Sequence, residues 1–96
     1  MAAYLVAHID VHDSDSYQRY REQVAPLVDR FGGRFRIRGG NVEVLEGDWQ
    51  VGRLVVIEFA SRDALRQFYE SPEYQELVRL RQHAASGPVV IAEGVD

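Results

Sequence analysis

Apolar and polar side chains alternate at the start of the chain and then return at helical spacing. Apolar residues occupy every second position between residues 4 and 11, which predicts a first strand. From Asp13 and Ser14, which are natural N-cap residues, to Phe31, apolar side chains recur every three or four positions. This second pattern predicts a helix of roughly 18 residues, about 27 Å long.

The next alternating region predicts a long strand that contains a bulge. Arginine alternates with phenylalanine and isoleucine over residues 34–38, and alternation resumes over residues 41–45. The glycine pair between them is typical of a bend or bulge within a strand. Residues 46–52 are then the turn, and residues 53–60 form the most β-like run of the chain.

The last third predicts helical segments followed by a final strand. Ser61 is a natural N-cap, and the Ser71-Pro72 pair is typical of the start of a new helix. Gly87-Pro88 ends the helical region, and residues 89–92 form the last strand. The order β-α-β-β-α-β predicts one domain over residues 1–96, an α+β ferredoxin-like sandwich. We expect a four-stranded antiparallel or mixed sheet, strands one and three parallel at its centre, and two helices on one face.

The sequence of the central strand predicts that both faces of the sheet are covered. Residues 54–59, LVVIEF, are apolar on both sides, whereas helices on one side cover only one face of the sheet. A second copy of the chain would cover the other face, because a two-fold interface is self-complementary. The alternative is that the loop around Trp49 folds back over this face.

Four segments resemble the domain-of-unknown-function family 1330. They are FGGRFRIRGG at 31–40, VEVLEGDW at 42–49, RLVVIEF at 53–59 and SPEYQELVRLR at 71–81. The resemblance implies a ferredoxin-like fold of the dimeric α/β-barrel superfamily, in which two sheets face each other across a homodimer. It implies no particular activity. Members elsewhere in this superfamily resemble cofactor-free monooxygenases, haem-degrading enzymes, lactone isomerases and stress-response proteins, and chemistry does not transfer with a fold.

Composition excludes several functions. Eleven arginines against fifteen acidic residues give a net charge of −4, so we expect no nucleic-acid partner. The chain has no lysine and no cysteine, which excludes Schiff-base chemistry, thiolate nucleophiles and disulfides. No metal motif or dinucleotide fingerprint occurs, so we expect neither metal nor cofactor. The broken apolar stretch at residues 1–11 indicates a strand rather than a signal peptide, and no run is long enough to span a membrane, so we expect a cytoplasmic protein.

Glu58 and His8 are the candidate catalytic residues. Glu58 is an acid in an apolar central strand, so it must be paired, protonated or next to a cavity. Arg38 is its expected partner, either in a structural ion pair or in a ligand site. His8 and Asp10 share a strand face, and a parallel third strand would place Glu58 beside them as a general-base site or a weak metal site. The alternative is a histidine that is hydrogen-bonded within the sheet.

Further candidates for ligand binding surround these two residues. Arg38 belongs to a row of alternating arginines that would either grip a carboxylate or phosphate or pair with nearby acids. Glu46 and Trp49 lie in the predicted turn, where the indole would edge a pocket or close a dimer interface. Tyr69 and Arg81, on the later helices, complete the predicted binding set.

Two functions therefore remain open from the sequence. The first is a cofactor-independent small-molecule enzyme or binder whose cleft lies between sheet and helices and is lined by His8, Arg38, Glu58 and Tyr69. The second is a non-catalytic homodimeric module whose polar residues hold the fold and the interface together.

Overall fold

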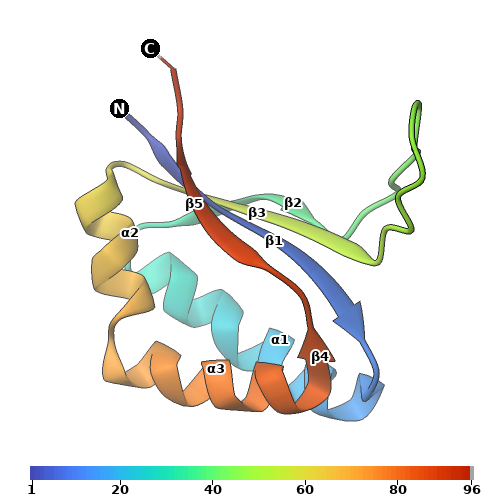
Figure 1. Ribbon diagram of the computed structural model, residues 1–96. Helices are drawn as coiled ribbons and strands as arrows, with labels where there is room; N and C mark the ends of the chain where they lie inside the picture. The colour runs from blue at the N-terminus through green and yellow to red at the C-terminus, as the bar shows by residue number, and fades with distance from the viewer. Residues whose placement is uncertain (96) are drawn as a thin grey trace.

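The elements follow the predicted order, with one short addition. A computed structural model describes residues 1–95 (Figure 1). Its elements are β1 (Ala3–Val11), α1 (Ser14–Arg30), β2 (Arg34–Arg38), β3 (Arg53–Phe59), α2 (Arg62–Tyr69), α3 (Pro72–Ala84), β4 (Ala85–Ser86) and β5 (Val89–Glu93). The two-residue β4 gives five strands where four were predicted. The new helix predicted at Ser71-Pro72 is confirmed as α3, and its separation from α2 gives three helices where the fold class predicted two.

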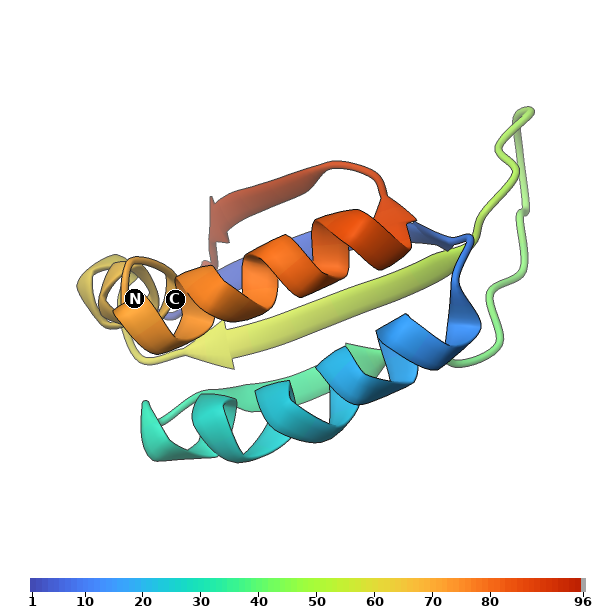
Figure 2. The same ribbon diagram turned by 90° about the horizontal axis from the view of Figure 1, so that it is seen from below.

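The domain has two layers, a sheet and a helical layer on one of its faces. The strand order is β2-β3-β1-β4, and β5 also pairs with β1 (Figure 1). α1 and α3 run side by side beneath the sheet, as the view from below shows (Figure 2). This arrangement confirms the predicted ferredoxin-like α+β sandwich.

The two central strands run antiparallel, so the prediction that they are parallel is wrong. β1 pairs antiparallel with β3, and β3 pairs antiparallel with β2. The reason lies in the crossover: α1 returns the chain so that β2 runs in the direction of β1, and the following loop reverses it into β3. β3 therefore enters the sheet between two strands that run opposite to it.

The predicted long second strand ends at Arg38. Residues 39–52 contain no strand, and they project from the end of the sheet on the side away from the helices (Figure 1). Gly39 has a positive φ of 77° and donates its N–H to the Leu54 carbonyl at 2.8 Å, so the chain turns away from β3 at this point. The alternation over residues 41–45 thus belongs to a loop, which has no neighbouring strand to pair with.

Side-chain caps start each helix as the sequence predicts. The Asp13 carboxylate accepts hydrogen bonds from the Ser16 N–H at 3.1 Å and the Ser16 hydroxyl at 2.8 Å. These bonds lower the pKa of Asp13. Ser61 and Ser71 cap α2 and α3 by accepting from the N–H groups of Ala64 and Tyr74.

The core fills the space between the two layers. Alternate residues of the central strands point into it, among them Leu5, Ile9, Ile57 and Phe59, all of them buried. Tyr74, Phe68 and Leu65 meet them from the helices and are almost fully buried. No helix within residues 1–95 is long and apolar enough to cross a membrane.

Candidate functional site

A bulge in β2 turns one arginine toward the helices. The pairing of β2 with β3 shifts register between Phe35 and Ile37, so Phe35 pairs with Ile57 whereas Ile37 pairs with Val56. An uninterrupted strand would place Arg34, Arg36 and Arg38 on one face. The extra residue changes the alternation, and Arg38 comes to lie on the same side of the sheet as Phe35.

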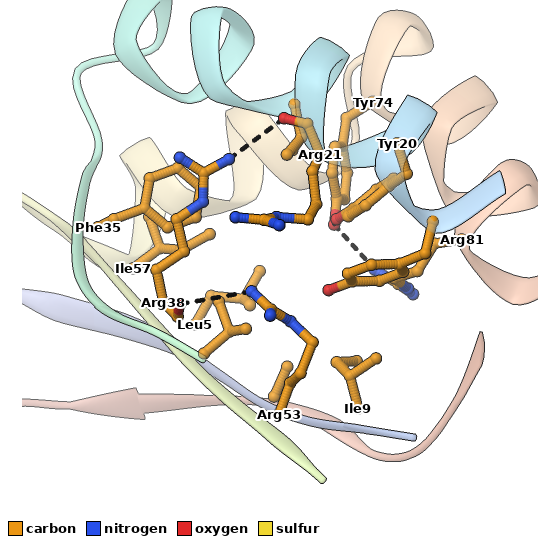
Figure 3. A pocket seen from close by; sticks show the side chains of 14 residues that line it. Leu5, Ile9, Tyr20, Arg21, Phe35, Arg38, Arg53, Ile57, Tyr74 and Arg81 are labelled. Atoms are coloured by element: carbon orange, nitrogen blue, oxygen red, sulfur yellow. Dashed lines mark hydrogen bonds between the residues drawn. The ribbon is translucent and has the colours of Figure 1, made fainter. Parts of the chain in front are cut away.

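Arg38 lines a pocket between the sheet and the helices, which we call the arginine pocket (Figure 3). The empty space in the pocket is about 440 Å³, its open mouth included. Its polar lining consists of four arginines, Arg21, Arg38, Arg53 and Arg81, and three tyrosines, Tyr17, Tyr20 and Tyr74. Its floor is apolar and comes from alternate residues of β1 and β3, including Leu5, Ile9 and Ile57.

Three of these guanidinium groups point toward one another at one end of the pocket (Figure 3). Arg38 lies over the Phe35 ring, 4.3 Å from its centroid, and donates to the Arg21 carbonyl at 3.2 Å. Arg53 donates to the Arg38 carbonyl at 3.3 Å. Carbonyl oxygens and aromatic faces therefore position these cations without neutralising their charge.

No acidic side chain lines the arginine pocket. The four ion pairs found within residues 1–95 use other arginines, namely Arg30, Arg36, Arg62 and Arg66. In addition, the Nε atoms of Arg21 and Arg53 are buried without a hydrogen-bond partner among the described residues. Buried donors are normally satisfied, and like charges held close together repel, so this part of the pocket favours an anion.

The other end of the arginine pocket holds a chain of hydrogen bonds. Arg81, which is only 7% exposed, donates Nη1 to the Tyr74 hydroxyl at 2.8 Å. The Tyr74 and Tyr20 hydroxyls are 2.9 Å apart and share one hydrogen. Burial raises the pKa of Tyr74, and it raises the pKa of Tyr20 well above its usual value, with the neighbouring Tyr74 adding to the effect on Tyr20. Both phenols therefore stay protonated around neutral pH.

Two of the predicted site residues, Arg38 and Arg81, meet in this pocket. His8 and Glu58 do not, because their positions along β1 and β3 put them on the opposite face of the sheet. His8 pairs with Leu54 and Tyr4 pairs with Glu58, so the two residues lie four positions apart, roughly 13 Å along the strands. The antiparallel register thus excludes the predicted His8–Glu58 cluster.

Glu58 pairs with Arg36 instead of the expected Arg38. The distance from Arg36 Nε to Glu58 Oε1 is 2.6 Å, on the sheet face away from the helices. His8 has a structural partner too, since its Nε2 accepts a hydrogen bond from the Gly52 N–H at 2.8 Å. In a single chain, both candidate catalytic residues are thus engaged in contacts within the sheet and its loop.

The remaining predicted residues lie outside the arginine pocket. Trp49 is half exposed and meets the His8 ring edge-on, with centroids 5.2 Å apart. Glu46 is exposed in the same loop. Tyr69 packs against Tyr74 at 5.6 Å between ring centroids and lines a separate groove beside β5. In this structure, the role of these three residues in binding stays a prediction.

Sequence reasoning missed Arg21 and Arg53 as site residues. Arg21 follows Tyr17 by four positions, so it belongs to the apolar face of α1. A cation on the apolar face of a helix is a sequence signal that could have identified it as a site residue. Arg53 is the first residue of β3 and pairs with Ile9 of β1. Spacing along the sequence does not predict this pairing. Within residues 1–95, no three potential metal ligands are gathered together. The expectation of no metal and no cofactor stays a prediction.

Fold and pocket together define a ferredoxin-like α+β protein with a cleft between its sheet and its helices. The family described as "Domain of unknown function (DUF1330)" matches residues 2–95, so the chain belongs to this family. This finding confirms the family resemblance in the sequence. No curated protein matches the chain.

Solved structures share this fold at low sequence identity. RPA0582 of Rhodopseudomonas palustris, a protein of unknown function, is 19% identical with a TM-score of 0.79, over 99% of this chain and 83% of that one. A dimeric ferredoxin-like protein of unknown function from Jannaschia sp. CCS1 is 17% identical with a TM-score of 0.75, over 98% and 100%. SnoaB of Streptomyces nogalater, a cofactor-independent oxygenase, is 14% identical with a TM-score of 0.71, over 99% and 94%. At these identities the likeness shows the fold alone.

Proposed function

We propose that the protein binds a small organic anion with an apolar body in the arginine pocket. The observation that carries the proposal is the convergence of Arg21, Arg38 and Arg53 without any acidic side chain in the lining. A carboxylate or similar group would accept hydrogen bonds from these guanidinium groups and would relieve the repulsion among them.

The shape of the pocket supports a ligand with an apolar body. The apolar floor of β1 and β3 lies beside the cationic end of this candidate small-molecule site. Apolar walls with a few convergent polar groups are typical of such sites. A flat aromatic or alicyclic acid would place its ring on this floor and its charged group among the arginines.

Binding is better supported than acid–base catalysis by a side chain. The lining contains no histidine, aspartate or glutamate that would accept a proton, and its tyrosines Tyr20 and Tyr74 have raised pKa values. Any chemistry in the pocket would therefore act by stabilising a negative charge, which needs no cofactor. The cofactor-independent oxygenase SnoaB shares the fold, which is consistent with such chemistry but does not assign it.

A second copy of the chain is the proposed cover of the open sheet face. On this face Val6, Leu54 and Val56 are only partly covered, Val90 is 53% exposed and Ile37 is 41% exposed. The neighbour from Jannaschia is described as dimeric, which supports a homodimer here. This face is also the observation that favours the alternative function, a non-catalytic dimeric module.

The composition supports a cytoplasmic location as part of the proposal, because a chain without cysteine makes no use of an oxidising compartment.

A thermal-shift screen tests the proposed function. Benzoate, 2-naphthoate and cyclohexanecarboxylate are compared with their neutral amides at equal concentration, because a ligand that binds only the folded state raises the unfolding midpoint. We expect the acids to raise the midpoint of the native protein and the amides to leave it unchanged. The same set is run on Arg53→Met and on Arg79→Met, a control that removes an exposed arginine outside the pocket. Midpoints that do not respond to any acid would favour the non-catalytic module.

A further inference from the structure

The two hydroxyls at the inner end of the arginine pocket leave one hydrogen without a partner. Tyr20 and Tyr74 carry two phenolic hydrogens, and their mutual hydrogen bond uses one. Arg81 donates to the Tyr74 oxygen and so adds no acceptor for the second hydrogen. Among the described residues, no acceptor binds it. Both tyrosines are buried, and both line the pocket.

The direction of the hydrogen bonds from Arg81 to Tyr74 and on to Tyr20 favours Tyr20 as the residue with the unpartnered hydrogen. When Arg81 donates to the Tyr74 oxygen, the Tyr74 hydroxyl becomes a better donor, and its nearest acceptor is the Tyr20 oxygen. The Tyr20 hydrogen is then free for a ligand.

The pocket therefore offers two separate sites for oxygen atoms. One is the arginine end, formed by Arg21, Arg38 and Arg53, and the other is the hydroxyl of Tyr20 (Figure 3). A ligand that satisfies both carries a second oxygen on its ring, at a position separate from the acidic group. We propose that this second oxygen is an acidic hydroxyl of an aromatic or enolic ring, bound as its oxyanion against the Tyr20 hydroxyl; the inference rests on the proposed binding of an organic anion.

The ionised form is favoured because donors and positive charge face this oxygen and no acceptor does. The ligand O–H bond breaks and its proton passes to the solvent buffer, so the absence of a basic side chain in the lining is no obstacle. The raised pKa of Tyr20 keeps its own hydrogen in place, and Tyr20 stays the donor while the ligand becomes the anion. Tyr20 would contact the ligand, whereas Tyr74 and Arg81 would act as positioning residues.

The probe for this inference is 5-hydroxy-2-nitrobenzoate, whose hydroxyl ionises with a large change in visible absorbance. Its control is 2-nitrobenzoate, which keeps the carboxylate and lacks the hydroxyl. We expect binding to lower the phenolic pKa of the probe by about one unit, which equals a tenfold preference for the ionised form. Tyr20→Phe should remove most of this shift, Tyr74→Phe should reduce it, and Arg79→Met should leave it unchanged. Both phenylalanine variants keep the ring that fills the core, and circular dichroism checks their folding.

The outcomes separate the inference from the function on which it rests. If both probes bind but the phenolic pKa of the bound probe is unchanged, the oxyanion site is refuted and the anion pocket stands. If the shift persists in Tyr20→Phe and Tyr74→Phe, the oxyanion lies among the arginines and the inference is again refuted. If neither probe binds at millimolar concentration, the inference and the anion pocket both fail for aromatic acids.

Discussion

Arg36, and not Arg38, neutralises Glu58, with 2.6 Å between Arg36 Nε and Glu58 Oε1. The bulge between Phe35 and Ile37 separates the two arginines onto opposite faces of the sheet. Arg36 balances the acid of the central strand on the open face, which leaves Arg38 free for the pocket beneath. One extra residue in β2 thus separates a structural ion pair from a candidate ligand site.

A double-mutant cycle in urea tests this division. Glu58→Gln and Arg36→Met should show a coupling energy of about 0.5–1 kcal/mol, because the pair is partly exposed, with side-chain exposures of 27% and 51%. Glu58→Gln and Arg38→Met should be additive, since Arg38 contacts the Phe35 ring and the Arg21 carbonyl. Coupling of Glu58 to Arg38 with none to Arg36 would show that the bulge is misplaced.

Gly39 should be essential for the placement of Arg53. Its φ of 77° is costly for any other residue, and a Cβ there would collide with the Arg53 guanidinium. Gly39→Ala should therefore lower the free energy of unfolding by about 1–2 kcal/mol and weaken the binding of organic acids. Gly40→Ala is the matched control, because a Cβ at Gly40 meets nothing within 4 Å. Equal stability and equal ligand affinity in the two variants would contradict this role.

Alkaline pH should destabilise the fold through the tyrosine pair. The native state raises the pKa values of Tyr20 and Tyr74, so above about pH 10 the unfolded chain releases phenolic protons that the native protein still holds. Their contribution to stability is complete below about pH 10 and is lost as the pH rises from there through the native pKa values. Urea unfolding between pH 8 and pH 11 should show a shallower decline for Tyr20→Phe than for the native protein. Tyr4→Phe, outside the pocket, should leave the decline unchanged.

A charge on the open sheet face should prevent the proposed dimer. Val56 pairs with Val6 across the two central strands and lies in the middle of this face. Val56→Asp should shift sedimentation equilibrium at micromolar concentration from twice the chain mass to the single chain mass, with the native circular dichroism retained. Val95→Asp is the control, since Val95 is 97% exposed and lies beyond the last strand. A native protein that is already a folded monomer would exclude the homodimer.

The helices and strands could be predicted well from the sequence, because burial of one face of an element makes its apolar residues recur at a regular spacing. The alternation of β1 and the helical spacing of α1 directly reflect which residues face the core, and both segments form where expected. Residues 41–45 show the limit of this reasoning, because an alternating segment becomes a strand only if a neighbouring strand pairs with it.

The candidate site was harder to predict because it depends on register and strand direction. A single bulged residue decides which arginines share a face, and the antiparallel register of β1 and β3 separates His8 from Glu58. Neither feature leaves a periodic signal in the sequence. Arg81 was predicted as a binding residue and does line the pocket, whereas its connection to Tyr20 through Tyr74 required the packed structure.

Isothermal titration of 2-naphthoate and 2-naphthamide is the most direct test of the anion pocket. The account predicts that the native protein binds the acid at least tenfold more tightly than the amide, equivalent to about 1.4 kcal/mol. Arg53→Met should abolish this preference, and Arg79→Met should preserve it. Equal affinity for acid and amide in the native protein, or an unchanged preference in Arg53→Met, would contradict the account.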